Sequence, residues 1–274
     1  ALFQIYPFFS TAYTSFTDAS LMSLEEHFVG LKNYQDVMKD RLFLTSLKNT
    51  ALYLVIDGVG VVVFGMLMAV ALNQKLRGTS FFRTAFYIPV LVDWVIVSIV
   101  FIFILEPNFG VANWVLTQLG IPQQKFLTSP QQAMPIIALA SVWKGAGYYA
   151  VFFLAALQDV PVDLKEAAQI DGAGRWRQLW HITLSSLRST IVVLLIFRVG
   201  EMMYAGFDQI FAISNYLVVS VADIIDTYVY RLGMESRKFS EATAAGLFQS
   251  AIGLVLVLVT NYIAKKIDTE SGIM

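Results

Sequence analysis

The sequence predicts an all-helical integral membrane protein, and three observations support this fold class. Of the 274 residues, 57% are hydrophobic and only 14% are charged, whereas soluble domains carry about 25% charged residues. The apolar residues form long runs, such as 58–72, which contains no charged side chain. These runs lack the alternation of a membrane β-barrel. Because lipid offers the backbone no hydrogen-bond partner, the spanning segments are expected to be helices.

Six segments are predicted to cross the membrane, because each approaches the roughly 20 apolar residues that span about 30 Å of hydrocarbon. The expected spans are 1–17, 49–72, 84–105, 134–157, 189–210 and 242–264. The chain begins at Ala1, inside an apolar stretch, so we expect further residues to precede it. We interpret the whole chain, 1–274, as a single transmembrane domain.

Charge suggests the orientation and excludes some functions. The net charge is −1, which gives no indication of nucleic-acid binding, and the absence of cysteine excludes disulfides and thiolate metal sites. We expect no metal site. The short connection 73–83 holds three basic residues and no acid, so the positive-inside rule places it in the cytoplasm together with 159–188. The segments 18–46, 106–132 and 212–241 then lie outside.

The cytoplasmic connection 159–188 predicts two short helices separated by a turn. Asp163, with Glu166 three residues later, has the spacing of a capping box. Ala167 and Ala168 favour helix and leave a slim surface, and Gly172 can end the first helix with a positive φ.

The second predicted helix of this connection is amphipathic. Trp176, Leu179, Trp180 and Ile182 can form its apolar side. Because Trp and Arg are enriched where proteins meet, this side indicates a protein interface. The alternative is an ordinary amphipathic connector between two spans.

The same connection resembles the "EAA" coupling loop of the permease subunits of binding-protein-dependent ABC importers. The matching residues are Glu166, Ala167, Ala168, Asp171, Gly172, Ala173, Trp180, Ile182 and Leu184. The family usually places Pro after that Leu, where this chain has Ser185. Segment 28–34 looks like the GLxNY segment that follows the first span of sugar permeases, and 77–89 looks like their second cytoplasmic loop. Segments 226–231 and 239–247 look like the polysaccharide or alginate-type branch of the maltose-permease-like group.

The resemblance implies a six-helix bundle of the methionine-permease (type I) class in the bacterial inner membrane. It implies that the coupling loop docks on an ATPase subunit. The residues expected to carry this coupling are Glu166, Ala167, Ala168, Asp171, Gly172, Ala173 and Trp176. The chain contains no Gly-x-x-x-x-Gly-Lys-Ser/Thr motif, so ATP and magnesium are expected on separate ATPase subunits and the chain itself is not expected to be an enzyme.

The resemblance also implies four kinds of partner: two ATPase subunits, a second permease subunit of different sequence, a periplasmic solute-binding protein and an oligosaccharide. The second permease is also expected because six spans enclose too small a lumen for an oligosaccharide. The binding protein is expected to touch the outer segments 18–46, 106–132 and 212–241.

Polar residues within the predicted spans are candidates for a substrate path, because ionisable groups at membrane depth are costly. The candidates are Asp57, Lys144, Tyr148, Arg198, Glu201 and Tyr204. The alternative for the charged residues is that Arg198 with Glu201, and Lys144 with Asp57, are buried pairs that neutralise each other. The alternative for Tyr148 is a packing or interface role.

Two cations in neighbouring spans, Lys144 and Arg198, suggest an acidic sugar such as a uronate oligomer, because Arg matches a carboxylate in a bidentate fork. A permease for a neutral oligosaccharide or another small solute remains the alternative. An ion-coupled secondary carrier would predict related halves with matched helix breaks, and the sequence has neither. A scaffold subunit would not need intramembrane charges.

Overall fold

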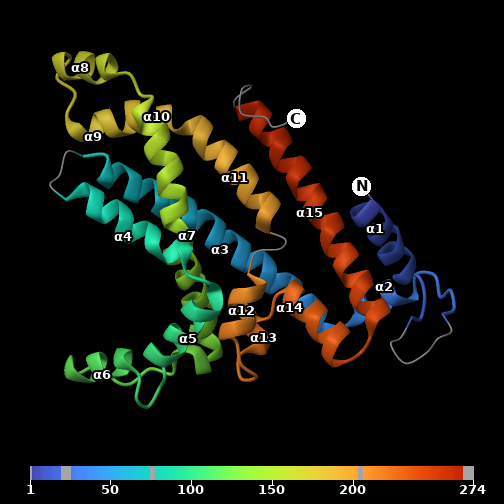
Figure 1. Cartoon of the computed structure of the whole chain (residues 1–274). Coiled ribbons are helices and arrows are strands. Elements are labelled where there is room, and N and C mark those ends of the chain that lie inside the picture. The colour runs from blue at the N-terminus through green and yellow to red at the C-terminus, as the bar shows by residue number, and fades with distance from the viewer. Residues whose placement is uncertain (1, 20–25, 75–77, 203–205, 268–274) are drawn as a thin grey trace. The chain divides into compact units, whose positions relative to one another are not determined.

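The computed structural model describes residues 2–19, 26–74, 78–202 and 206–267, and every regular element in these ranges is helical (Figure 1). One isolated antiparallel bridge joins Thr17 to Phe28. The chain divides into two compact units, and three long helices contribute residues to both. The first unit comprises 1–54, 94–137 and 202–255, and the second comprises 55–93, 138–201 and 256–274.

The first unit is built from short helices and from the N-terminal parts of the three long ones. Its elements are α1 (Leu2–Thr14), α2 (Lys32–Lys39), the start of α3 (Arg41–Leu72), α5 (Trp94–Ile104), α6 (Val111–Gln118), a 3₁₀ turn (Phe126–Thr128), the start of α7 (Pro130–Gln158), α12 (Phe207–Ile213), α13 (Val219–Ala222), α14 (Ile225–Tyr230), a π turn (Arg231–Glu235) and the start of α15 (Phe239–Ile267). Its core joins Phe43 of α3, Tyr228 of α14 and Ala245 of α15.

Buried polar side chains fasten the segment around α14 to the start of α3. The Asp223 carboxylate is buried and accepts hydrogen bonds from Ser46 at 2.9 Å and from Thr227 at 2.5 Å, and it pairs with Arg231. Asn49 donates to the Asp223 carbonyl at 3.0 Å. A buried charge is tolerated when it is paired and hydrogen-bonded in this way.

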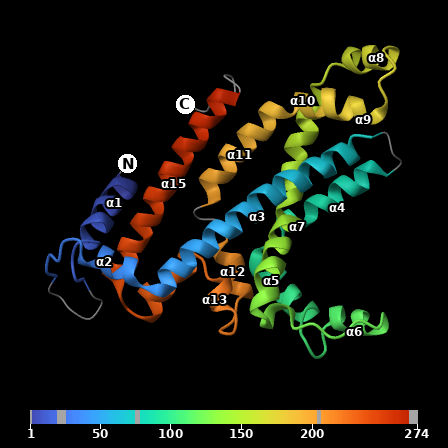
Figure 2. The ribbon, with the colours of Figure 1, turned by 180° about the vertical axis from the view of Figure 1, so that it is seen from behind.

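The second unit contains the connection 159–188 and the rest of the long helices. Its elements are the remainder of α3, α4 (Thr79–Leu91), the remainder of α7, α8 (Val162–Ile170), α9 (Arg175–Gln178), a π turn (Leu179–Thr183), α10 (Leu184–Ser186), α11 (Arg188–Met202) and the end of α15. Its core includes Val61, Tyr149, Phe153 and Leu187. Both views place α8 and α9 together beyond the end of α7 (Figures 1 and 2).

Glycines allow the helices of the second unit to approach closely. A Cβ added at Gly65 of α3 would lie 2.6 Å from the Cβ of Tyr149 on α7. A Cβ added at Gly147 of α7 would lie 2.1 Å from the carbonyl oxygen of Phe86 on α4. Close approach at small residues is the usual way in which helices pack in lipid.

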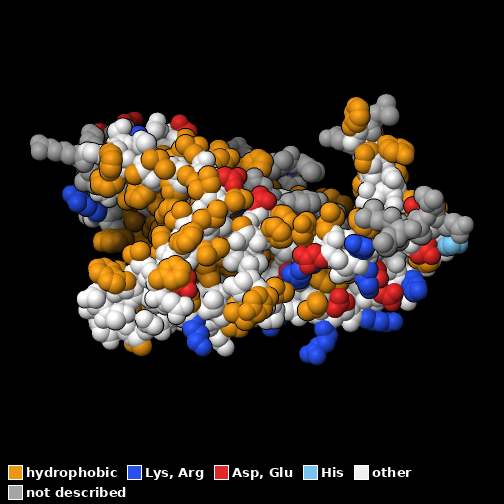
Figure 3. Space-filling model, turned by 60° about the horizontal axis from the view of Figure 1, so that its bottom comes forward, with side chains coloured by type: hydrophobic (Ala, Val, Ile, Leu, Met, Phe, Trp, Pro, Cys, Tyr) orange, Lys and Arg blue, Asp and Glu red, His pale blue; other side chains and the backbone are white. Residues whose placement is uncertain are grey.

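The expectation of an all-helical membrane protein is confirmed. Among the described residues, α3, α7 and α15 are each long and apolar enough to cross a membrane, and the number rises to 5 if two bent helix pairs each count as one span. Many large apolar side chains on these helices are exposed, as lipid-facing residues would be. Figure 3 shows many hydrophobic side chains on one face of the molecule, interspersed with other surface atoms. The helix α1, with 13 residues, is not among these candidates.

Two spans predicted as continuous helices are broken, so that part of the prediction is wrong. The predicted span 84–105 consists of α4 and α5, which are bent by 100° at Val92 and Asp93. Pro89 near the end of α4 weakens the helix there, and Asp93 stands directly before α5, where Asp favours a helix start. The predicted span 189–210 is divided between α11, which ends at Met202, and α12, which follows Gly206 with a φ of +117°.

Candidate functional site

The helix α8 presents the start of the predicted coupling loop, but the predicted capping box is absent. Pro161 occupies the N-cap position and makes no side-chain cap hydrogen bond. The helix therefore begins at Val162, two residues earlier than a cap at Asp163 requires. Asp163 lies in the first turn instead, where its negative charge favours the helix N-terminus. Glu166 lies one turn further along α8 and is exposed.

The predicted end of this helix at Gly172 is confirmed. Gly172 has a φ of +75°. The N–H of Ala173 donates to the carbonyl of Ala168 at 2.8 Å, and the N–H of Gly172 donates to that of Gln169 at 3.1 Å. This pattern is a Schellman motif, which needs a residue that tolerates the left-handed conformation. The glycine therefore sets the angle at which the chain leaves α8.

The second helix of the coupling loop forms as predicted, but a π turn interrupts it. The run consists of α9, the π turn 179–183 and α10. The side chain of Gln178 donates to the carbonyl of Ala173 at 2.7 Å, which ties this run back to the turn. Trp176 is 75% exposed and Trp180 is 64% exposed.

Together, α8 to α10 therefore offer a partner an exposed surface with two large aromatic side chains. Of the residues assigned to coupling, Glu166, Ala167, Asp171 and Gly172 are exposed, and Ala168 and Ala173 are half-buried. Exposed apolar groups of this kind mark interaction sites.

Among the described side chains, one ion pair joins two charged residues of the spans in a way that neither predicted pairing anticipated. Arg198 of α11 forms a salt bridge with Asp57 of α3, and the Asp57 side chain is only 1% exposed. Asp57 is thus paired with Arg198 and not with Lys144. The ammonium group of Lys144 donates to the carbonyl of Val90 at 3.1 Å, near the C-terminal end of α4. A cation is favourable there because helix carbonyls at that end carry partial negative charge.

The remaining predicted path residues are less fully placed. Tyr148 of α7 is partly exposed and makes edge-on ring contacts with Tyr149 and Phe152. Glu201 belongs to α11, and its side chain lies outside the described part of the structure. Tyr204 lies outside the described residues altogether.

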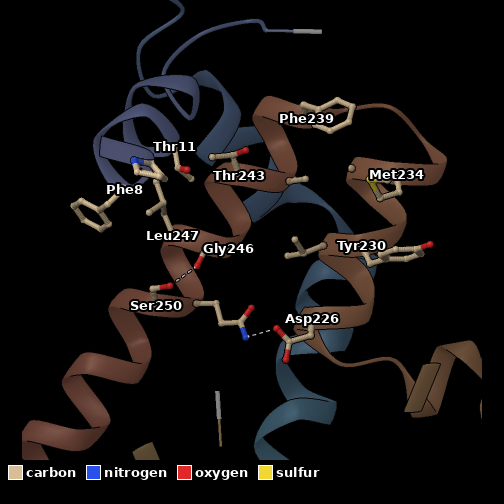
Figure 4. A pocket seen from close by; sticks show the side chains of 15 residues that line it. Phe8, Thr11, Asp226, Tyr230, Met234, Phe239, Thr243, Gly246, Leu247 and Ser250 are labelled. Atoms are coloured by element: carbon tan, nitrogen blue, oxygen red, sulfur yellow. Dashed lines mark hydrogen bonds between the residues drawn. The ribbon is translucent and has the colours of Figure 1, made fainter. Parts of the chain in front are cut away.

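Sequence reasoning did not identify a cavity in the first unit. Its volume is about 620 Å³, and α1, α14 and α15 line it (Figure 4). Thr243, Gly246 and Ser250 of α15 face it, and a Cβ added at Gly246 would meet nothing within 4 Å. Gln249 donates to the Asp226 carboxylate at 2.7 Å, and burial raises the pKa of that carboxyl. The small residues Ala242, Gly246 and Ser250 recur every four residues along α15, and this spacing was a sequence signal of the cavity.

Comparison with known proteins identifies the family. Residues 61–269 match the family described as "Binding-protein-dependent transport system inner membrane component". The chain belongs to this family. It is therefore a multi-pass permease component of the inner membrane and not itself an enzyme, and ATP binding resides on a separate ATPase subunit.

Curated relatives agree with this assignment over most of their length. The chain is 39% identical over 249 residues to Protein LplB of Bacillus subtilis, which covers 90% of this chain and 78% of that protein. It is 37% identical over 252 residues to the polygalacturonan/rhamnogalacturonan transport system permease protein YteP of the same organism, with the same coverage. It is 31% identical over 286 residues to the diacetylchitobiose uptake system permease protein NgcF of Streptomyces coelicolor, covering 98% and 81%.

Solved structures agree with the fold. A chain of a bacterial alginate ABC transporter, in complex with an alginate pentasaccharide-bound periplasmic protein, has a TM-score of 0.91 and 30% identity, and the match covers 99% of this chain and 91% of that one. An amino acid ABC transporter has a TM-score of 0.55 at 14% identity, covering 87% and 98%, and shares the fold alone.

Proposed function

We infer that this permease subunit imports an oligosaccharide that carries uronate groups, by alternating access driven by ATP. The observation that carries the proposal is the agreement of two separate comparisons on acidic polymers. One is the structural match to the transporter of alginate, and the other is the sequence match to the permease for polygalacturonan and rhamnogalacturonan. These substrate names denote polymers that contain uronate carboxylates. A path lined by cationic side chains would suit such carboxylates.

The coupling loop is proposed to connect the spans to the ATPase. When ATP closes the ATPase dimer, α8 to α10 would move with it as a rigid lever and open the pathway outward. The Schellman turn at Gly172 and the hydrogen bond from Gln178 to Ala173 support this rigidity. Exposed Trp176 and Trp180 would fill a groove on the ATPase, with Glu166 and Asp171 at its edge.

The salt bridge between Asp57 and Arg198 indicates different roles for the two intramembrane cations, Arg198 and Lys144. A buried Arg that is paired with a carboxylate offers less to a passing uronate, so its main role is proposed to be neutralising Asp57. Lys144, half-buried beside the bend between α4 and α5, is the cation proposed to face the substrate, with Tyr148 as an aromatic neighbour one turn along α7.

The assembly is proposed to contain this chain, a second permease of different sequence, two ATPase subunits and a periplasmic binding protein. The six-span topology is proposed with it, since the broken helices and α1 then complete a type I bundle. A neutral oligosaccharide is the competing substrate, because a diacetylchitobiose permease covers nearly the whole chain at 31% identity.

The test is the ATPase activity of the co-purified complex in lipid, with its binding protein, against uronate and neutral oligosaccharides of equal length. Stimulation by uronate oligomers alone is expected. A Lys144→Gln variant should reduce this stimulation, whereas Lys125→Gln, which removes an exposed lysine in an outer segment, should not. Stimulation by neutral sugars alone would contradict the acidic substrate.

A further inference from the structure

The helix α6 presents an exposed apolar face just after the end of α5. Val111, Trp114, Val115 and Leu119 are all exposed, and Trp114 is 65% exposed. Phe103, near the end of α5, is also exposed. In both ribbon views α6 projects sideways from the end of α5 (Figures 1 and 2).

Hydrogen bonds hold this face in a fixed position. Asn113, on the opposite side of α6, is buried. Its amide donates to the carbonyls of Pro107 and Gln124 at 2.8 Å each, and its oxygen accepts the N–H of Gln124 at 2.9 Å. A Cβ added at Gly110 would lie 2.4 Å from the carbonyl oxygen of Glu106, so only glycine fits at the start of α6. The apolar face therefore belongs to a helix whose position is fixed by specific hydrogen bonds and packing.

The charge pattern indicates what covers this face. Residues 107–124 contain no charged side chain. The helix α2, in the same unit and of the same 8-residue length, exposes Lys32, Asp36 and Lys39. A surface that meets water and soluble proteins usually carries such charges at its rim. A face of Trp and other large apolar side chains is typical of a helix that lies in the membrane–water interface, where Trp is enriched.

We propose that α6 lies in the membrane–water interface on the periplasmic side, with Val111, Trp114, Val115 and Leu119 inserted among the lipids. The helix then anchors the end of α5 at Ile104, which is the end opposite to the bend that separates α5 from α4. Docking of the periplasmic binding protein would fall to the charged outer segments around α2 and 231–241. The side of the membrane rests on the orientation in the proposed function, but the depth of α6 does not.

The test is a depth measurement on the whole complex in lipid nanodiscs. The chain has no cysteine, so Trp114→Cys provides a single attachment point for a nitroxide once the partner subunits are made cysteine-free. The accessibility of this label to oxygen, which concentrates in lipid, is compared with its accessibility to a water-soluble nickel chelate. Gln35→Cys, an exposed position on α2, is the matched control.

The proposal expects the label at position 114 to be severalfold more accessible to oxygen relative to nickel than the label at position 35, with or without the binding protein. Free access of nickel to position 114 would overturn it. Protection that arises only when the binding protein is added would overturn it in favour of protein docking. Protection from both reagents would do so in favour of burial against the second permease. None of these readings depends on transport, so failure here is distinct from failure of the proposed substrate.

Discussion

Removing one partner of the salt bridge between Asp57 and Arg198 should be far more harmful than removing both. The Asp57 carboxylate is 1% exposed and lies in the long apolar helix α3. In Arg198→Met, that carboxylate would stay buried without its cation, which costs about 3–5 kcal/mol of folding free energy in soluble proteins. Replacing both partners by apolar residues of similar volume is often neutral or stabilising. The double variant Asp57→Leu/Arg198→Met should therefore recover most of the loss.

The assay is a double-mutant cycle on unfolding of the purified complex in mixed detergent–lipid micelles. Arg83→Met, which removes an exposed arginine from the same unit, serves as a control and should change the unfolding free energy by less than about 0.5 kcal/mol. We expect a coupling energy of at least about 2 kcal/mol between Asp57 and Arg198. Additive effects within about 0.5 kcal/mol would refute the reasoning. A stable double variant that no longer transports uronates would instead assign Arg198 to the substrate path.

Three further predictions concern the coupling loop, the helix crossing and the cavity. Gly172→Val should strain the left-handed turn and reduce substrate-stimulated ATPase activity, with about 1–2 kcal/mol of local strain, while Gly174→Ala, at an open position with extended backbone, should have little effect. Gly147→Val should lower the melting temperature of the complex, because its side chain would collide with the Phe86 carbonyl, whereas substitution at Gly246, which faces open space, should not. Asp226→Asn should stabilise the complex at neutral pH. Burial raises the folded-state pKa of Asp226 above the usual range of an Asp carboxyl. The stability that the protonated carboxyl contributes is therefore fully present below the unfolded pKa and is lost as the pH rises through the folded pKa. Melting temperatures across this pH range should converge with those of the parent chain in acid, and a constant difference at all pH values would contradict this origin.

Local patterns predicted the two helical segments of 159–188 and the long helices well. The uncharged run 58–72 lies inside α3, and Gly172 ends α8 as its position after a helical segment suggested. These features depend on residues that are close in sequence. The capping box failed for a local reason as well, because Pro161 starts the helix before Asp163 can cap it.

The pairing of charges could not be predicted, because it depends on which helices meet. Asp57 and Arg198 are 141 residues apart, and the competing partner Glu201 is only one turn from Arg198. The hydrogen bonds to the buried Asp223 carboxylate were missed for the same reason, since Ser46 is 177 residues away from Asp223 in the sequence. The bend at Asp93 was readable in principle, since Pro89 and an acidic residue interrupt an apolar run there.

The most direct test of the central claim is uptake of a labelled uronate oligosaccharide into proteoliposomes that contain the complex, with the loaded binding protein outside and ATP inside. The account predicts accumulation that requires ATP, is competed by unlabelled uronate oligomers and is not competed by neutral oligosaccharides of equal length. Accumulation of the neutral sugar in place of the uronate would contradict the acidic substrate. Uptake of either sugar without ATP, driven by an ion gradient, would contradict the ATP-driven mechanism itself.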